Sequence, residues 1–509
     1  MPVRRNARSA VVFASLVMGL APTAGCGAGA RPADTAPVVT PVAVAAAAAP
    51  RAGAAFREPP TLGSRDGVLR AKLSVRRQRV LVAGARVWAK VYRGSFPGPT
   101  LRVHPGETLE RHVVYELGEP TNLHEHGLHV SPIGISDNVL RTVPAHNAAQ
   151  VRVQIPQNVP PGTYWYHPHL HGLAEEQSFA GLSGAIVVDG LAERMPAGLR
   201  TIRDHLIALK DVQIRDGAII DHAMDSQAPT TRTVNGQVDP VLSVGTDATH
   251  LLRLANMSAD IWYRLTLDGA RFGVVAEDAN PVGRVWRAGT LVLPPGKRYD
   301  VLVRWPREGT YALRTRRMNT GPAGDTYPAA RLMRFRVGGV PAPQIAWPRS
   351  LGPLPTLDRA HVDRVRHITF SEDQRRNRFL INGRQFAATR VDEVVRLGAT
   401  EECVLRNRSR EEHPFHIHTD DFQVIAVNGR RYRARGLQDT VAIPVGGTVR
   451  IRLRFADFVG AFVFHCHILA HEDAGMMGIV DVTRNGRRPS ARTLKGLHAM
   501  RASMPMNMP

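Results

Sequence analysis

The chain has 509 residues, and 43% of them are apolar, which excludes a wholly disordered protein and leaves room for two to four domains. Its formal net charge is +22, but the arginines are scattered and no Lys/Arg run interleaves with aromatic residues, so no nucleic acid is expected as a partner. Only three cysteines occur, Cys26, Cys403 and Cys466, which excludes a disulfide-stapled fold. Cys403 is expected to be a small buried apolar side chain.

The N-terminal segment differs in character from the rest of the chain. Three arginines come before the apolar run of residues 10–18, which is too short to span a bilayer. This pattern predicts an export signal over residues 1–26 and a location in the periplasm or at the cell surface. The signal ends in a sequence similar to a bacterial lipobox, so a lipid anchor at Cys26 and ordinary cleavage nearby are both open. The Ala/Pro-rich residues 27–65 are then expected to form a tether without a core of its own.

Beyond the tether, the sequence consists mostly of short β-branched runs separated by Gly, Pro and Asn. Residues 69–75 and 151–155 alternate polar with apolar side chains, and residues 97–103 read as a turn that leads into a strand. Nothing in this range keeps a helical period for long. The sequence therefore predicts an all-β protein built from sandwiches or barrels.

An internal repeat divides this β region. The Val-Asn-Gly-Gln of residues 234–237 recurs as Ile-Asn-Gly-Arg at 381–384, and the Leu-Ala-Asn-Met-Ser of residues 254–258 recurs as Leu-Arg-Asn-Arg-Ser at 405–409. The two offsets, 382 − 235 = 147 and 407 − 256 = 151, are close enough to indicate a duplicated domain. With a preceding unit of similar size, we expect three β domains, followed by a basic, Met-containing tail. The predicted bounds are 66–190, 191–345 and 356–485 for the domains and 486–509 for the tail.

Four histidine clusters carry the chemistry. The sequence has 21 histidines, and ten of them fall into these clusters: His124 and His126; His167 and His169; His413, His416 and His418; His465, His467 and His471. A single His-x-His pair is a weak indication of a metal, because two imidazoles on one strand face are usually solvated or core residues. Four clusters, two early and two late in the chain, indicate metal sites.

Cys466 stands between two histidines, and the alternation of side chains along a strand separates them. His465 and His467 point to one face of the strand, whereas Cys466 points to the other. The thiolate of Cys466, the imidazole of His471 and the thioether of Met476 suit a trigonal copper site with a weak axial ligand. A cysteine that binds one metal while its neighbours bind another is a short covalent connection between two centres.

Parity sorts the third cluster in the same way. His413 lies three residues before His416 and has the opposite parity, so it is grouped with Cys466. The other eight imidazoles are expected in one place: His124, His126, His167, His169, His416, His418, His465 and His467. Eight neutral ligands are too many for one first-row ion, but they fit three coppers, six on a pair and two on a third.

These clusters and their surroundings resemble the three-domain multicopper oxidases, the group that contains laccases, bilirubin oxidases and bacterial copper-efflux oxidases. The resemblance covers about residues 66–485 and implies three cupredoxin-like Greek-key β-barrel domains with four copper ions. It implies a type 2 copper at His124 and His416. It further implies a type 3 pair held by His126, His167, His169, His418, His465 and His467. It also implies a type 1 copper held by His413, Cys466, His471 and Met476.

The resemblance also implies how the domains share the work. Ligands from the first and last domains place the three-copper site at their interface, whereas the middle domain has no copper site of its own. That domain keeps residues 294–300, Pro-Pro-Gly-Lys-Arg-Tyr-Asp, which are similar to the family's middle domain, and it is expected to act as a spacer and substrate wall.

The implied reaction passes single electrons from a small-molecule donor to a type 1 copper, and then through Cys466 to the three-copper site, where O2 becomes water. Glu472, beside His471, and Asp137 fall where related oxidases place the acids that supply protons. The alternative to a proton-transfer role, for both acids, is a solvated or hydrogen-bonded surface carboxylate. The protein is expected to act as a monomer.

The donor is the least determined feature. An axial Met476 lowers the type 1 potential relative to an apolar residue, which favours methoxyphenols, bilirubin-like pigments, organic dyes or Cu(I). One alternative is a cuprous oxidase for copper resistance, because Met504, Met506 and Met508 place soft thioethers near the C-terminus. The other is a non-catalytic cupredoxin-fold copper-binding protein; such relatives lack ligands, and here all twelve are present.

Overall fold

The computed structural model describes residues 52–222, 224, 228–353 and 355–503. The predicted export signal, the lipid anchor at Cys26 and the methionines of the tail, Met504, Met506 and Met508, lie outside these residues. No helix within the described ranges has the length and apolar character needed to cross a membrane.

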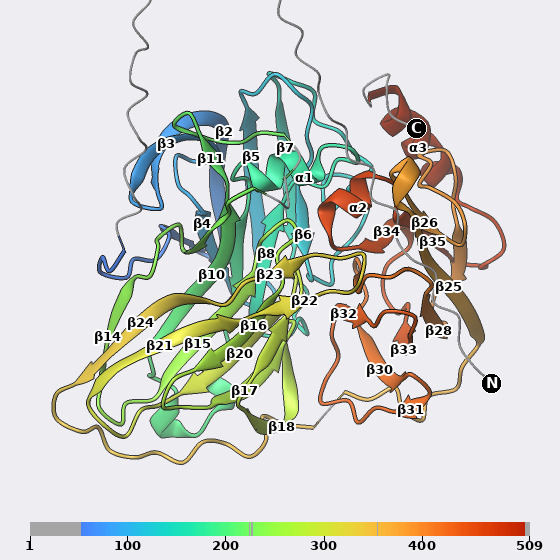
Figure 1. The fold of residues 1–509 in the computed structure, drawn as a ribbon. Coiled ribbons are helices and arrows are strands. Elements are labelled where there is room, and N and C mark those ends of the chain that lie inside the picture. Colours follow the sequence, from blue (N-terminus) through green and yellow to red (C-terminus); the bar gives the residue numbers. More distant parts are fainter. Residues whose placement is uncertain (1–51, 223, 225–227, 354, 504–509) are drawn as a thin grey trace, which may run out of the picture. The chain divides into compact units, whose positions relative to one another are not determined.

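Two sheets form the first domain (Figure 1). The first has the order β1 (Thr61–Gly63), β4 (Gly98–Val103), β9 (Gly184–Val188), β8 (Gly162–His167) and β6 (His124–His126). The second has the order β11 (Ile214–Arg215), β12 (Ala218–Ile219), β3 (Ala85–Tyr92), β2 (Val68–Val82), β5 (Thr108–Tyr115) and β7 (Ala148–Gln154). Burial alternates strictly along β7, as a strand with one wet face requires.

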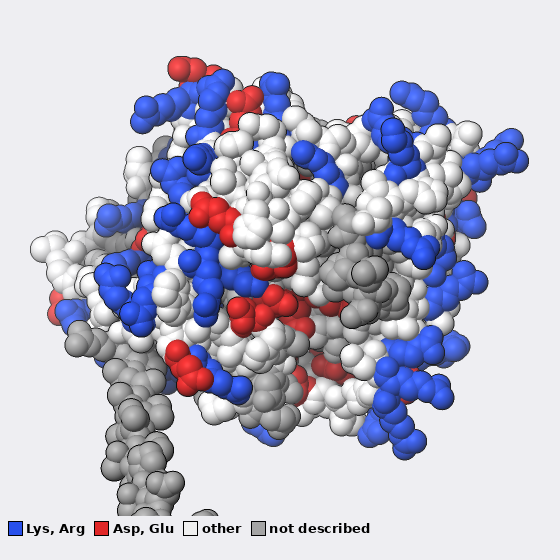
Figure 2. Space-filling model, turned by 90° about the horizontal axis from the view of Figure 1, so that it is seen from above, with Lys and Arg blue, Asp and Glu red and all other residues white. Residues whose placement is uncertain are grey.

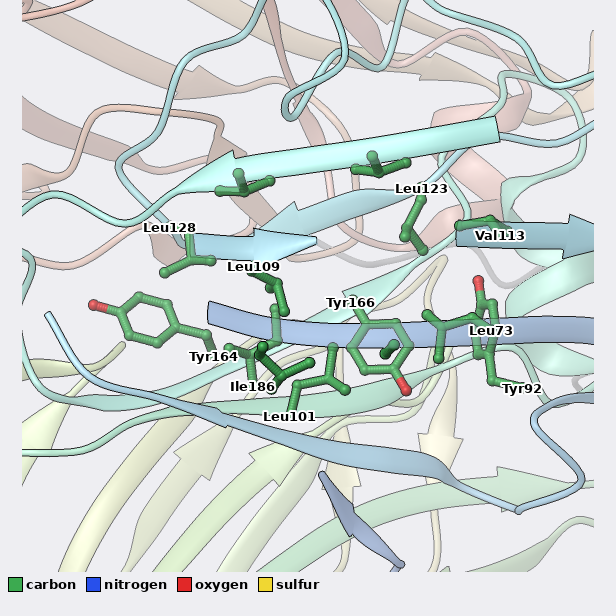
Figure 3. Close-up of a cluster of buried hydrophobic side chains, with 14 of the residues drawn as sticks. Leu73, Tyr92, Leu101, Leu109, Val113, Leu123, Leu128, Tyr164, Tyr166 and Ile186 are labelled. Carbon is green, nitrogen blue, oxygen red and sulfur yellow. The ribbon is translucent and has the colours of Figure 1, made fainter. Parts of the chain in front are cut away.

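A hydrophobic core lies between these two sheets. Figure 3 shows side chains from several strands pointing into it, among them Leu73 and Leu109 from one sheet and Leu101, Tyr166 and Ile186 from the other. All five are at most 1% exposed. Burial of this apolar surface is the main favourable term for folding. Strands β8 and β6 come last in their sheet, where their histidines can contact another domain.

The middle domain repeats the two-sheet plan. One sheet has the order β13 (Thr231–Val234), β10 (Asp204–Val212), β15 (His250–Asn256), β20 (Arg298–Val303), β17 (Phe272–Glu277) and β18 (Asn280–Ala288). The other has the order β14 (Val241–Gly245), β24 (Ala330–Gly338), β21 (Gly309–Arg316), β16 (Tyr263–Leu267) and β19 (Leu291–Leu293), and a small ribbon pairs β22 (Met318–Asn319) with β23 (Thr326–Tyr327).

The third domain is built in the same way and carries the remaining ligands. One sheet has the order β26 (Arg378–Ile381), β25 (Arg364–Asp373), β28 (Thr400–Asn407), β33 (Thr448–Arg454), β30 (Phe422–Val427) and β31 (Arg430–Arg431). The other has the order β27 (Glu393–Arg396), β35 (Met477–Thr483), β34 (Gly460–Cys466), β29 (His413–Ile417) and β32 (Thr440–Ile443). The predicted all-β class, with three two-sheet domains, is thus confirmed.

The internal repeat corresponds to a repeated piece of structure. Asn256 accepts a hydrogen bond from the backbone N–H of Ser258, and Asn407 accepts the same bond from Ser409. In each copy the asparagine Nδ2 also donates to a carbonyl a few residues ahead, Ile261 in one and Glu411 in the other. Each asparagine therefore fixes the turn that follows its strand.

Helices are few and short in the part of the chain that the structure describes. They are α1 (Ala174–Phe179), α2 (Leu469–Asp473) and α3 (Ala491–Ser503), with 3-10 turns at Ala192–Arg194, Ala197–Leu199 and Gln374–Arg376. Helices α1 and α2 come from the first and third domains and pack against each other (Figure 1). Asp473 of α2 accepts the backbone N–H groups of Gly172, at 2.6 Å, and Glu175, at 2.8 Å. This carboxylate ties the two domains together close to the last histidine cluster.

Three segments differ from the predicted organisation. Residues 52–65 are not wholly a free tether, because the N–H of Phe56 donates to Val241 O and β1 pairs in parallel with β4. Strands β11 and β12 follow residue 190 but join the first domain through the pairing of Ala218 with Trp88. The tail forms helix α3, with Leu497 and Met500 buried. Each segment owes its order to contacts with distant strands, which composition does not report.

Candidate metal centres

Two pairs of antiparallel strands present the clusters. In the first domain β6 and β8 place His124 opposite His167. In the third domain β29 and β34 place His416 opposite His465 and Phe415 opposite Cys466. Because successive side chains on a strand point to opposite faces, this register puts the histidines on one side of β34 and the cysteine on the other.

The eight histidines that were expected in one place, from His124 to His467, come together at the interface of the first and third domains. We call them the histidine cluster, and every member is at most 2% exposed. Their nitrogens form three groups that could each hold a metal: His124, His126 and His416; His126, His167 and His467; His169, His418 and His465. The contacts across the domain interface are short, with Nε2 of His467 3.1 Å from Nδ1 of His126 and Nε2 of His169 3.1 Å from Nε2 of His465.

Hydrogen bonds at the outer nitrogens fix the ring orientations in this cluster. Nδ1 of His124 lies 3.0 Å from Asp137 Oδ1, Nδ1 of His416 lies 2.9 Å from the Asp439 carbonyl oxygen, and Nδ1 of His167 lies 2.8 Å from the Pro168 carbonyl oxygen. The inner Nε2 atoms of the same three rings are buried and have no hydrogen-bond partner among the described residues. Buried acceptors without a hydrogen-bond partner, in rings whose nitrogens lie in groups of three, fit a bound metal.

Burial also sets the charge state of these rings. It lowers the pKa of His124, His126, His167, His418 and His467 well below 6.5, and neighbouring imidazoles lower it further. Neutral imidazoles keep the lone pair that a metal needs. The donor set is therefore nitrogen-only and uncharged, which suits copper rather than Mg²⁺ or Ca²⁺.

Cys466 faces a second group, which we call the thiolate centre: His413, Cys466, His471 and Met476. Its Sγ atom lies 3.5 Å from Nδ1 of His413 and 3.8 Å from Nδ1 of His471. Met476 is fully buried, and two backbone bonds hold it there, from Cys466 N to Met476 O at 3.0 Å and from Met476 N to His471 O at 2.8 Å. Burial raises the pKa of Cys466 well above 9.0, so a thiolate here requires a bound cation.

Neighbouring side chains hold the two imidazoles of the thiolate centre. Oγ of Ser409, from the repeated Asn-x-Ser turn, lies 2.7 Å from Nε2 of His413. The ring of Phe379 stacks on His471 with a centroid distance of 4.1 Å and an interplanar angle of 17°. His413 is completely buried, whereas His471 is 8% exposed, so His471 is the edge of this centre that faces outside molecules.

One carboxyl group lies beside each imidazole of the thiolate centre. Glu411 Oε2 lies 3.7 Å from Nε2 of His471, and Glu372 Oε2 lies 3.9 Å from Nε2 of His413. Glu411 is only 4% exposed, and burial raises its pKa to about 8. Elsewhere the molecule is strongly basic: Figure 2 shows Lys and Arg spread over one face, with Asp and Glu gathered near its middle.

Both predicted proton-supplying acids are buried beside the histidine cluster. Glu472 is fully buried, with its carboxylate 3.3 Å from Nδ1 of His169 and 3.0 Å from Nδ1 of His465. Burial alone would raise the pKa of Glu472, but these imidazoles lower it to about 2. Asp137 is 4% exposed and also accepts the N–H of Glu125, at 3.1 Å; burial raises its pKa. Neither is a solvated surface carboxylate.

Sequence reasoning missed two groups beside the cluster, Asp439 of the third domain and Arg298 of the middle domain. Asp439 Oδ1 lies 3.3 Å from Nε2 of His126, and Arg298 binds the same carboxylate. The signal for Arg298 was its place in the Pro294–Asp300 segment, but nothing in the sequence marks Asp439. The middle-domain histidines His205 and His250 do meet, with ring centroids 5.4 Å apart, yet neither is in a candidate metal group of the described residues.

Comparisons with known proteins agree with this geometry. Three profiles described as multicopper oxidase match residues 74–193, 209–336 and 359–486. A multicopper oxidase of Staphylococcus aureus is 26% identical over 404 residues, covering 77% of this chain and 83% of that protein.

Two solved structures extend the likeness to the fold. A laccase-like multicopper oxidase of Ochrobactrum, described as having oxidase activity towards lignin model compounds, is 29% identical with a TM-score of 0.73, over 84% of this chain and all of that one (100%). A multicopper oxidase of Campylobacter jejuni, described as a metallo-oxidase, is 26% identical with a TM-score of 0.75, over 85% of this chain and 96% of that one.

Proposed function

Because the chain belongs to the multicopper oxidase family, we propose that it is a laccase-like oxidase that couples one-electron oxidation of phenolic or other small donors to reduction of O2 to water. One observation carries this proposal: Cys466 of the thiolate centre is joined by peptide bonds to His465 and His467 of the histidine cluster. Four coppers, one of type 1, one of type 2 and a type 3 pair, would supply the redox chemistry when bound.

The ligand assignment follows the groups of nitrogens. His126, His167 and His467 would hold one member of the type 3 pair, and His169, His418 and His465 the other. His124 and His416 are left for type 2, with inner Nε2 atoms that have no other partner among the described residues. His413, Cys466 and His471 would hold type 1, with Met476 as the axial ligand.

The protein's own groups then perform three tasks. His471 presents a partly exposed ring to an outside donor, while Cys466 and its peptide neighbours provide a short path inward. Glu472 holds His169 and His465 in place and can pass protons between the cluster and its surroundings. Asp137 fixes His124 with Nδ1 protonated, so its Nε2 remains free.

Copper loading tests this proposal directly. The protein reconstituted with Cu(II) should show about four coppers per chain, a blue absorption band, and O2 uptake with a methoxyphenol that yields water without hydrogen peroxide. A matched Cys466→Ser variant should bind fewer coppers and lose the blue band. A copper-loaded wild-type protein without a blue band would refute the oxidase proposal.

A cuprous oxidase is the second candidate, and the carboxylates beside the thiolate centre favour it. Carboxyl oxygens of Glu411 and Glu372 lie 3.7 Å from His471 and 3.9 Å from His413. Burial raises the pKa of both groups, and a cation that binds beside them would stabilise their ionised form. Oxygen uptake with Cu(I) as donor distinguishes the two: a cuprous oxidase loses it in the Glu411→Gln variant, whereas oxidation of a neutral phenol falls much less.

We also propose that the protein is exported and acts as a monomer. The arginines and apolar run of residues 1–18 support export, with Cys26 as the position of a lipid anchor. Fractionation of cells that express the full chain tests the location, and Cys26→Ala tests the anchor. Light scattering of the copper-loaded protein tests the oligomeric state.

A further inference from the structure

No described residue of the middle domain is in a candidate metal group, yet one turn of this domain lies against the histidine cluster. The turn is Pro294–Lys297, which leads into β20. A Cβ atom added to Gly296 would lie 2.9 Å from Cδ2 of His467 and 3.0 Å from Cε1 of His126. The backbone of this turn therefore lies directly against two rings of the cluster, and its φ of +85° also requires glycine.

Arg298, at the start of β20, connects all three domains. Its Nη1 and Nη2 donate to the two carboxylate oxygens of Asp439 in the third domain, at 2.8 and 2.7 Å. Its Nε donates to the carbonyl oxygen of Thr163 in the first domain, at 3.1 Å. The side chain is completely buried. A bidentate fork on a carboxylate fixes both distance and angle, which a single point charge does not.

Asp439 in turn touches two rings of the cluster. Its carbonyl oxygen accepts the Nδ1 proton of His416 at 2.9 Å. Its Oδ1 lies 3.5 Å from the same Nδ1 and 3.3 Å from Nε2 of His126. Nδ1 of His416 is therefore held by a hydrogen bond, whereas His126 has Asp439 beside its Nε2 and His467 3.1 Å from its Nδ1.

Lys297 and Asp278 hold the backbone around Asp439 from the same side. Lys297 Nζ donates to the side-chain oxygen of Gln438 at 2.8 Å and to the carbonyl of Thr440 at 2.9 Å. Asp278 Oδ2 accepts the backbone N–H groups of Asp439 and Thr440, both at 3.2 Å. Thr440 of β32 pairs with His416 of β29, so the hydrogen bonds to Thr440 also fix the position of the strand that carries His416.

Stability alone does not account for this arrangement. The desolvation cost of burying ions offsets most of their attraction, and well-packed apolar residues often serve an interface as well. The Arg298–Asp439 pair instead fixes the position of one carboxylate beside the imidazoles of His416 and His126.

We propose that Arg298 and Asp439 are positioning residues, through which the middle domain orients His416 for the copper that it shares with His124, and His126 for the neighbouring type 3 copper. The inference rests on the proposed function, because it assigns the copper of His416 and His124 to type 2. The middle domain is then a structural part of the three-copper site as well as the expected spacer.

The test compares two conservative variants with a matched control. Arg298→Lys keeps the charge and loses the fork, and Asp439→Asn keeps the shape while leaving Arg298 beside Asp278, 3.6 Å away. The control is Arg253→Lys. Arg253 is also buried in the middle domain, donates to Asp204 at 2.7 Å and lies 3.4 Å from Thr163 Oγ1, but no ion pair or hydrogen bond links it to a cluster histidine.

The readouts are copper retention against a mild chelator, the type 2 electron-spin-resonance signal, the blue band and circular dichroism. Both variants should lose the type 2 signal and release that copper ~10- to 100-fold more readily, while the blue band and the circular dichroism match the control. Copper retention equal to that of Arg253→Lys overturns the proposal. So does joint loss of the fold and of every copper in both variants, because the pair would then be a folding element. Wild-type protein that takes up no copper would instead refute the proposed function.

Discussion

Oε2 of Glu472 lies 3.0 Å from Nδ1 of His465, so this carboxylate, from the residue after His471, supports a ring of the other centre. The same carboxylate reaches His169 of the first domain, at 3.3 Å. It is therefore a bridge between two domains, in addition to the proton transfer proposed for it.

Glu472→Gln should slow O2 reduction and leave the blue band unchanged. The amide keeps the shape but cannot accept and release a proton, which costs ~10²- to 10⁴-fold in steps that need general acid–base catalysis. Oxygen consumption at saturating donor measures the effect. Glu402→Gln is the control, because Glu402 is also buried in the third domain and pairs with Arg452, at 2.8 Å. Equal turnover in the two variants would remove Glu472 from the proton path.

Met476→Leu should raise the reduction potential of the thiolate centre while the blue band persists. The thioether is a weak axial ligand, and an apolar side chain of similar volume removes its electron donation to the metal. Met476 is fully buried, so the swap changes little else. Potentiometric titration of the blue band measures the shift. A potential that falls or stays constant would show that Met476 is not axial.

The alternation of β34 explains how much of the site is visible in the sequence. His465 and Cys466 had to face opposite ways, and the register of His416 opposite His465 places two clusters together as expected. Asp439 was not predictable, because its role depends on a contact with Arg298 that lies 141 residues away in the chain. No local period reports such a pair.

The same limit applies to the ends of the fold. The alternating runs predicted the all-β class, because one buried face per strand leaves a pattern in the sequence, and the internal repeat predicted three domains. The order of β1 and of α3 comes from long-range packing, with Leu497 and Met500 of a basic tail buried against other elements. A composition-based boundary cannot detect burial of single side chains.

Asp204 should make the protein lose stability in acid. It lies between Arg102, at 2.9 Å, and Arg253, at 2.7 Å. Burial opposes its ionisation, but the two arginines lower its pKa from 3.8 to about 2. A lowered folded-state pKa stabilises the protein above the ordinary pKa, and this contribution disappears as pH falls from about 4 to about 2. The shift corresponds to about 2 kcal/mol of unfolding free energy.

Denaturant unfolding of Asp204→Asn measures this contribution. The variant should be less stable than wild type by about 2 kcal/mol at pH 7, and the difference should shrink as the pH approaches 2. A difference that stays constant between these pH values would assign the loss to packing rather than to ionisation.

The two buried cysteines of the described chain should behave in opposite ways. Cys403 is 6% exposed, and burial raises its pKa to about 12, so it is an unreactive thiol in the core of the third domain. Cys403→Ala should keep the blue band and full oxidase activity, at a cost of about 1 kcal/mol in unfolding free energy. Cys466→Ala removes a side chain of the same size that is also buried, but it should abolish the blue band and O2 uptake, because no other thiol of the described residues is grouped with His413 and His471. The pair of variants thus separates packing from ligation within one domain. Loss of the blue band in Cys403→Ala, with the fold intact by circular dichroism, would contradict the assignment of the thiolate centre.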